Sequence, residues 1–162
     1  MGKTVIVTGA SQGIGAGVAK AFLDKGYNVV ATSRNVTKSK DLSASSLALV
    51  DGDIGDASVA AKVAETAISR FGSINALVNN AGIFFPKSFI DYTAEDLRML
   101  FSTNVEGYLY ITQFAVKQML AQKSGGSVVG ITSSLVENPI AGMNVSVPMI
   151  TKGAIDAVTR SL

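Results

Sequence analysis

The sequence predicts an α/β fold in which a doubly wound parallel sheet lies between two layers of helices, giving a three-layer αβα domain. Short β-branched segments alternate with longer segments whose apolar residues recur at helical spacing, and this alternation is typical of parallel sheets. The strand segments are almost entirely apolar, as strands buried on both faces are. The chain of 162 residues is 48% hydrophobic and 16% charged, which suits one compact domain over residues 1–162.

Each element can be placed along the chain from its pattern. We expect strands at 4–7, 29–32, 47–50, 76–78 and 127–131, and helices at 13–25, 56–71, 93–122 and from about 148, with a loop over 35–46. Gly26 and Gly72 are suited to end the first two helices. The long helix begins with Thr93-Ala-Glu-Asp96, which is a capping-box pattern. The expected strand order is 3-2-1-4-5, with a crevice at the carboxyl end of the first strand.

Composition excludes several classes of function. Lys and Arg total 14 and Asp and Glu total 12, a net charge of +2, so we expect no nucleic-acid partner. The sequence has no cysteine and no histidine, which excludes disulfides, thiol nucleophiles, His-containing triads and His- or thiolate-held metals; no metal site is expected. Because no apolar run approaches membrane-spanning length and no signal-peptide core follows Met1, we expect a cytoplasmic protein without a membrane partner.

A glycine-rich turn follows the first expected strand, in Thr8-Gly9-Ala10-Ser11-Gln12-Gly13-Ile14-Gly15. Glycine lets the backbone turn tightly and approach a pyrophosphate, and the following helix N-terminus offers free N–H groups. The spacing is G-x-x-x-G-x-G rather than G-x-G-x-x-G. An ordinary strand-to-helix turn is the alternative, but the strand–turn–helix context favours a dinucleotide site. The candidate cofactor-binding residues here are Gly9, Ser11, Gln12, Gly13, Ile14 and Gly15.

The second expected strand ends in Ser33-Arg34. An acidic residue at that place would bind the ribose 2′-OH of NAD, whereas arginine suits the 2′-phosphate of NADP because its guanidinium can pair with phosphate through two hydrogen bonds. A solvated surface arginine is the alternative. Since no acidic residue stands at this strand end, NADP(H) is the preferred cofactor and NAD(H) the second candidate.

Five motifs, in this order along the chain, resemble those of the short-chain dehydrogenase/reductase family, whose fold is Rossmann-like. They are Thr8-Gly9-x-x-x-Gly13-Ile14-Gly15, Asn79-Asn80-Ala81-Gly82, Asn104, Ile131-Thr132-Ser133-Ser134 and Lys152-Gly153-Ala154. Together they extend over nearly the whole chain. The sequence therefore resembles the amino-terminal portion of an NAD(P)-binding member of that family.

The resemblance implies roles for individual residues. Asn80, Ala81 and Gly82 would line the cofactor pocket and brace the sheet, and Asp53-Ile54 would face the adenine. Lys152 would hold the nicotinamide ribose. The implied catalytic residues are Asn104, which anchors a water relay, Ser134, which orients the substrate oxygen, and Lys152. Ser133 is the alternative to Ser134, because Ser134 lies one residue further from Lys152 than in the family. Taken singly, these residues would be a strand-end turn, a core asparagine and a surface lysine.

One departure from the family concerns the proton donor. The resemblance implies a tyrosine four residues before Lys152, and Pro148 stands there instead. Proline has no proton to give, yet it fits the first turn of a helix, so the helix should survive. Family members also continue beyond the helix in which this sequence ends, so we expect a domain truncated after the helix that follows the fifth strand. The segments that complete the sheet and close the substrate pocket would then be missing.

Three functions remain open. The first is an NADP(H)-dependent oxidoreductase that transfers hydride to or from a small-molecule carbonyl or secondary alcohol. The second is a catalytically impaired or inactive dinucleotide-binding protein that acts as a sensor or oligomer partner. The third is another reaction on the same scaffold. We expect these 162 residues to show little carbonyl reduction, and Pro148→Tyr alone not to restore it.

Self-association is also expected. A homodimer or homotetramer would form through the helix over 93–122 and the helix after Pro148, since symmetric dimers are the commonest oligomers. The apolar residues assigned to that surface are Leu97, Leu100, Phe101, Val105, Tyr108, Ile111, Ala115 and Met119.

Overall fold

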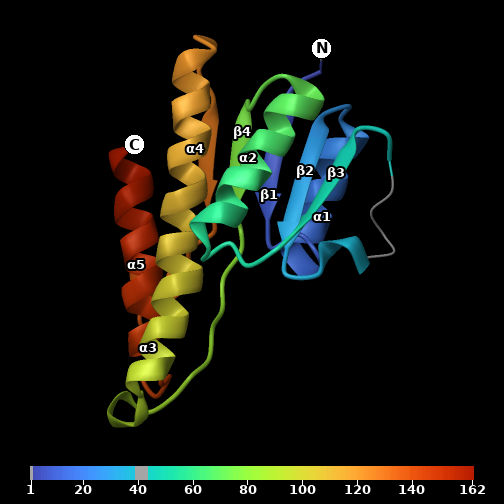
Figure 1. Ribbon diagram of the computed structural model, residues 1–162. Coiled ribbons are helices and arrows are strands. Elements are labelled where there is room, and N and C mark those ends of the chain that lie inside the picture. The colour runs from blue at the N-terminus through green and yellow to red at the C-terminus, as the bar shows by residue number, and fades with distance from the viewer. Residues whose placement is uncertain (1, 39–43) are drawn as a thin grey trace.

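The computed structural model describes residues 2–38 and 44–162 and has three layers, with helices on both faces of one sheet (Figure 1). The strands are β1 (Thr4–Thr8), β2 (Asn28–Ser33), β3 (Leu47–Asp51), β4 (Ala76–Asn79) and β5 (Ser127–Gly130). The helices are α1 (Gly13–Asp24), α2 (Ala57–Phe71), α3 (Ala94–Phe101), α4 (Gly107–Ala121) and α5 (Ser146–Ser161). The sheet order is β3-β2-β1-β4-β5 with all neighbours parallel, which confirms the predicted order and fold class.

The core lies on both faces of the sheet because successive strand residues point to opposite sides. Ile6 of β1 packs in the cluster formed with α2 and α4, while Val5 and Val7 pack in the cluster formed with α1. Each buried Val or Ile side chain stabilises the fold by roughly 1.5–3 kcal/mol. All five residues of β1 are buried, whereas β5 alternates between exposed and half-buried residues and pairs only with β4. The sheet is therefore most deeply buried at its centre.

Helix α2 is capped at both ends, and its end at Gly72 is the one that the sequence indicates. At its start, the Asp56 carboxylate accepts a hydrogen bond from the Ser58 N–H at 2.8 Å. At its end, Gly72 adopts a left-handed conformation with φ of 82°, which only glycine adopts readily. The predicted loop over 35–46 contains one short 3-10 turn, Val36–Lys38, and residues 39–43 of it lie outside the described residues.

The predicted helix over 93–122 is one continuous helical rod with an irregular turn inside it. Thr93 and Asp96 form the predicted capping box at the start of α3. A π-helical segment, Ser102–Glu106, then joins α3 to α4. Such π-turns insert one extra residue into a helix and often mark functional positions. This one contains Asn104, whose side chain is only 1% exposed.

The expected association surface on this rod was largely wrong. Leu100, Tyr108, Ile111, Ala115 and Met119 are buried. The last three pack in the core cluster with α2, and the Tyr108 hydroxyl shares a hydrogen bond with Thr159 of α5. Leu97 and Phe101 are exposed, as expected. Two exposed residues that were not expected, Leu109 and Phe114, lie on the outer side of α4.

Pro148 does not interrupt helix α5. Pro148 is the third helical residue, in the first turn, where its missing N–H leaves no intrahelical hydrogen bond unmade. Its side chain is buried, and its carbonyl oxygen accepts a hydrogen bond from the Thr151 hydroxyl at 2.9 Å. Among the described residues, no helix is long and apolar enough to cross a membrane, and no cluster of acidic side chains could hold a metal ion.

Candidate functional site

The glycine-rich turn between β1 and α1 is shaped by close backbone contacts. Gly9 has φ of 65°, and a Cβ atom on it would lie 2.8 Å from the Cα of Ala81. A Cβ on Gly15 would lie 2.3 Å from the carbonyl oxygen of Gly9. Atoms at those distances overlap, so only glycine lets the turn approach both the end of β4 and the first turn of α1. The turn leaves the N-terminus of α1 open at Gly13, which has φ of 57° and nothing within 4 Å of the place a Cβ would take.

Asn80 fastens this turn to β4. Its side-chain amide donates to the carbonyl oxygens of Thr8 at 3.0 Å and Gly9 at 3.1 Å. In return, the Thr8 hydroxyl accepts from the backbone N–H groups of Asn80 at 3.1 Å and Ala81 at 2.9 Å. These four hydrogen bonds join the carboxyl ends of two neighbouring strands, so the turn is held from both sides.

A cavity of about 360 Å³ opens at the carboxyl ends of β1 to β4. It is lined by Gly9, Ser11, Gln12, Thr32, Ser33, Arg34, Asn35, Gly52, Asp53, Ile54, Ala81, Gly82, Ile83 and Thr103. The structure thus brings together most of the candidate cofactor-binding residues. Five of those candidates lie outside the lining: Gly13, Ile14, Gly15, Asn80 and Lys152.

Sequence reasoning missed five lining residues: Thr32, Asn35, Gly52, Ile83 and Thr103. Each of the five adjoins a residue that was identified, so its position in the chain could have indicated it. Thr103 precedes Asn104 in the π-helical segment.

Charged and polar groups border the cavity. Arg34 is exposed at the end of β2, and it forms no ion pair with another described residue. The carboxylate of Asp53 accepts a hydrogen bond from the backbone N–H of Gly55 at 3.0 Å. Next to the lining residues Ser11 and Gln12, the N-terminus of α1 carries a partial positive charge. Arg34 and this helix terminus can each attract an anionic group.

Asn104 is fully engaged in hydrogen bonds. Its side-chain oxygen accepts from the Ile83 N–H at 2.8 Å, and its amide donates to the Ile83 carbonyl at 3.0 Å and the Thr151 hydroxyl at 2.9 Å. Thr151 is itself completely buried. The asparagine therefore joins three segments: the strand-end loop after β4, the π-helical segment and the first turn of α5.

Lys152 is held close to the same place. Its ammonium donates to the carbonyl oxygen of Ile131, after β5, at 2.8 Å. A Cβ atom on Gly82 would lie 3.2 Å from both the Lys152 Nζ and the Asn104 Oδ1, so both polar groups lie against Gly82, which lines the cavity. Burial disfavours the charged ammonium and lowers the pKa of Lys152 below its usual value.

Ser134 lines a different cavity from the candidate cofactor residues. It is exposed and borders a cavity of about 170 Å³ that shares no residue with the larger one. Ser133 lines that second cavity too, and its hydroxyl accepts from the Leu135 N–H at 3.2 Å. Of the three candidate catalytic residues, Asn104 and Lys152 lie against Gly82, and Ser134 makes no hydrogen bond with either.

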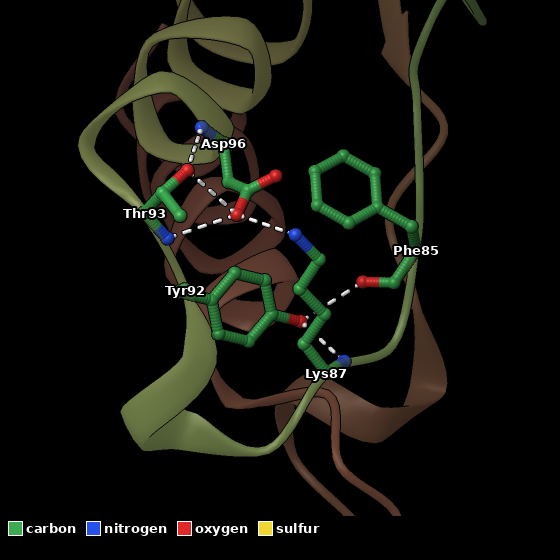
Figure 2. Close-up of polar contacts among 5 residues, drawn as sticks. All are labelled: Phe85, Lys87, Tyr92, Thr93 and Asp96. Atoms are coloured by element: carbon green, nitrogen blue, oxygen red, sulfur yellow. Dashed lines mark hydrogen bonds and ion pairs between the residues drawn. The ribbon is translucent and has the colours of Figure 1, made fainter.

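A further polar cluster holds the loop after β4, as Figure 2 shows. The Lys87 ammonium pairs with the Asp96 carboxylate at 2.6 Å, and the Tyr92 hydroxyl donates to the Phe85 carbonyl at 2.9 Å. The hydrogen bond from Lys87 and those from Thr93 lower the pKa of Asp96 to about 2. The Lys87 N–H also donates to the Asn144 carbonyl at 3.0 Å, so this loop is joined to the segment that precedes α5. The sequence indicated only the Thr93–Asp96 part of this cluster.

Comparisons with known proteins agree with this geometry. A family model described as short chain dehydrogenase matches residues 3–162. An L-fucose dehydrogenase of Bos taurus is 36% identical over 99% of this chain and 59% of its own length. An NADP-dependent (R)-specific alcohol dehydrogenase of Lentilactobacillus kefiri is 30% identical over 99% of this chain and 65% of its own length.

Solved structures give the same picture. A 3-ketoacyl-(acyl-carrier-protein) reductase of Brucella melitensis, complexed with NADH, is similar with a TM-score of 0.91 and 28% identity over 99% of this chain and 68% of that chain. A short-chain dehydrogenase of Streptomyces avermitilis is similar with a TM-score of 0.89 and 30% identity, and this chain covers 59% of it. The chain thus spans about two thirds or less of the length of its curated relatives.

Proposed function

Because the chain belongs to the short-chain dehydrogenase family, we propose that it binds NADP(H) in the larger cavity and serves an oxidoreductase reaction on a small-molecule carbonyl or secondary alcohol. One observation carries the proposal. A single cavity runs from the glycine turn to Ser33 and Arg34 in one direction and to Gly82, beside Lys152, in the other.

The residues present fit a dinucleotide. Gly9 lines the cavity, and its lack of a Cβ atom lets the turn pack against Ala81. The open N-terminus of α1 suits a pyrophosphate. Ser33 and Arg34 would hold the ribose 2′-phosphate, and Asp53 with Ile54 would lie along the adenine. Asn80 would support cofactor binding by holding the glycine-rich turn in place. Ala81 and Gly82 would do so because their backbone can lie close to the cofactor. The family as a whole supports NAD(P)(H) binding, and preference for NADP(H) is the part that we propose.

On the catalytic side, the chain's own residues would position the reactants. When bound, NADPH would donate the hydride to a carbonyl carbon, and NADP⁺ would accept it from an alcohol carbon. Lys152 would hold the ribose hydroxyls, and Asn104 would keep Ile83 and the first turn of α5 in place. With Pro148 in the family's tyrosine position, no hydroxyl is present at residue 148, so the proton would be exchanged with water held near Lys152.

A second candidate is a catalytically impaired dinucleotide-binding protein that acts as a sensor or as a partner in an oligomer. Two observations favour it: Pro148 is buried and cannot donate a proton, and Ser134 lies in a separate cavity from the candidate cofactor site. We also propose a homodimer or homotetramer through the exposed residues Leu97, Phe101, Leu109 and Phe114. The expected cytoplasmic location stays a prediction.

Calorimetric titration with NADPH and NADH tests the cofactor proposal. We expect NADPH to bind more tightly than NADH, because Arg34 can pair with the 2′-phosphate that NADH lacks. Equal dissociation constants for the two cofactors would contradict the preference, and the absence of binding by both would contradict the site itself.

A further inference from the structure

The segment after β2 forms one wall of the larger cavity and is fixed to the end of β3. Ser33, Arg34 and Asn35 line the cavity, while the next residue, Val36, is completely buried in the core beside α1. Ser33 lies opposite Asp51 in the parallel register, and its carbonyl oxygen accepts from the Gly52 N–H at 3.0 Å. The wall is thus anchored directly before and directly after Arg34 and Asn35.

A second contact, between Thr37 and Asp51, also fixes this segment to the end of β3. The Asp51 carboxylate accepts two hydrogen bonds from Thr37, one from its backbone N–H at 2.9 Å and one from its hydroxyl. Neither residue lines the cavity. Both residues are exposed, and their hydrogen bonds fix the chain directly after Arg34, Asn35 and Val36 to the end of β3.

The charge of Asp51 makes the direction of its side chain important. A carboxylate at the end of a strand beside the nucleotide site can bind ribose hydroxyls, and it repels a phosphate. Here the Thr37 hydrogen bonds, with a smaller effect from the positive charge of Lys38, hold the pKa of Asp51 below its usual value, so the carboxylate stays ionised. The Thr37 hydrogen bonds thus hold a negative charge that does not line the cavity beside Arg34.

We propose that Thr37 and Asp51 form a specificity-determining pair, which fixes Arg34 for a ribose 2′-phosphate and keeps the Asp51 carboxylate from the ribose. This inference rests on the proposed binding of NADP(H) in the larger cavity. It assigns cofactor choice to two residues that do not line the cavity, and it makes Thr37 a positioning residue.

A comparison of Thr37→Val with Thr37→Ser separates the effect of the Thr37 hydroxyl from the effect of the rest of the side chain. Calorimetric dissociation constants for NADPH and NADH are measured for the wild type and both variants. Valine keeps the shape of threonine and removes the hydroxyl hydrogen bond, so we expect the NADPH preference over NADH to fall roughly three- to tenfold, the usual range for one hydrogen bond. Serine keeps the hydroxyl, and the wild-type preference should be retained.

Thr66→Val is the matched control, because the Thr66 hydroxyl also makes a hydrogen bond, to Lys62 of α2, away from the cavity. The preference of Thr66→Val for NADPH over NADH should equal that of the wild type. An unchanged preference in Thr37→Val, or an equal loss of affinity for both cofactors, would overturn the inference while leaving the proposed function standing. A wild type that does not prefer NADPH would instead overturn the proposed cofactor choice, and the inference with it.

Discussion

The two ends of the candidate site differ in how completely they are built. On the side of β1 to β4, backbone geometry and side chains agree: the glycine turn, the Asn80 brace and Ser33-Arg34 all border one cavity. On the side of β5 and α5, Lys152 and Asn104 both lie against Gly82, but Ser134 lines another cavity and Pro148 offers no proton.

This difference reflects two kinds of requirement. Binding a dinucleotide depends mostly on backbone shape, which several glycines and a parallel sheet fix together. Proton transfer depends on one group with a suitable pKa at one place, and general acid–base catalysis typically contributes about 10²–10⁴-fold to the rate. One substitution can remove the second property and leave the first, which is what the chain's residues indicate.

The largest effect is expected from Gly15→Ala, which adds one methyl group to the glycine-rich turn. The new Cβ would lie 2.3 Å from the Gly9 carbonyl oxygen, so the turn must shift. We expect the free energy of unfolding to fall by roughly 1–3 kcal/mol, as for an overpacked core, and NADPH to bind clearly more weakly. Gly17→Ala in the same helix has open space at its Cβ and should be neutral or gain about 0.5–1 kcal/mol. Urea denaturation and calorimetry measure both. Equal stability of the two variants would contradict the close contact.

The second-largest effect is expected from reversing the charge at Arg34, which lines the cavity at the end of β2. Arg34→Asp removes the partner of the 2′-phosphate and supplies an acceptor for ribose hydroxyls, so NADH should become the tighter ligand. Hydrogen bonds to charged groups contribute about 1.5–3 kcal/mol, so we expect the preference to change by roughly 10- to 100-fold. Arg70→Asp, in the last turn of α2 before the amino end of β4, is the charge control. If Arg34→Asp left NADPH the tighter ligand, Arg34 would not be the phosphate partner.

A smaller effect, on the rate of NADPH oxidation, is expected from Pro148→Tyr, which restores only the missing tyrosine. Pro148→Tyr should leave NADPH oxidation with simple ketones near the wild-type rate. The side chain of residue 148 is buried, so a tyrosine hydroxyl has no open path to the cavity, and Ser134 stays apart. Absorbance at the reduced-nicotinamide band follows the reaction, and unchanged NADPH affinity is the control. Full activity in this variant would show that the missing hydroxyl is the sole deficit.

The smallest expected effect concerns the cluster that fixes the loop after β4. In the folded chain the pKa of Asp96 is about 2, against a usual value of 3.8. The carboxylate therefore adds stability above about pH 4, and this stability is lost as the pH falls through about 2. Asp96→Asn should lower the urea midpoint at neutral pH and flatten its dependence between pH 4 and pH 2. Glu95→Gln, an exposed neighbour paired with Arg98, should keep the wild-type slope. Parallel pH profiles for wild type and Asp96→Asn would contradict the account.

Much of the cofactor side could be predicted because its signals are local. Glycines at a strand end, residues at the end of β2 and a Thr-x-x-Asp cap each act within a few residues of themselves, so the sequence order alone reveals them. The parallel order of the strands follows from the alternation of strands and helices. Family membership, which the motifs indicated, is confirmed by the matching family model.

What could not be predicted depends on contacts between distant segments. The π-helical segment, which contains the lining residue Thr103, has no separate pattern in the sequence. The Thr37–Asp51 and Lys87–Asp96 pairs join residues 14 and 9 positions apart. The apolar stripe of the long helix was assigned to an association surface, because periodicity shows that a face is apolar without showing what covers it. The structure covers Tyr108 and Ile111 with the protein's own core.

The central claim, that the cofactor side is complete and the catalytic side is not, is tested most directly by mixing the wild-type chain with NADPH and then with a panel of simple aldehydes and ketones. Nicotinamide fluorescence reports both steps in one sample. The account predicts a fluorescence change when NADPH binds and no decay of the signal at ordinary enzymatic rates after the carbonyl compounds are added. Rapid decay would show that Lys152, Ser134 and water suffice for catalysis, and no change on adding NADPH would show that the cavity is not a dinucleotide site.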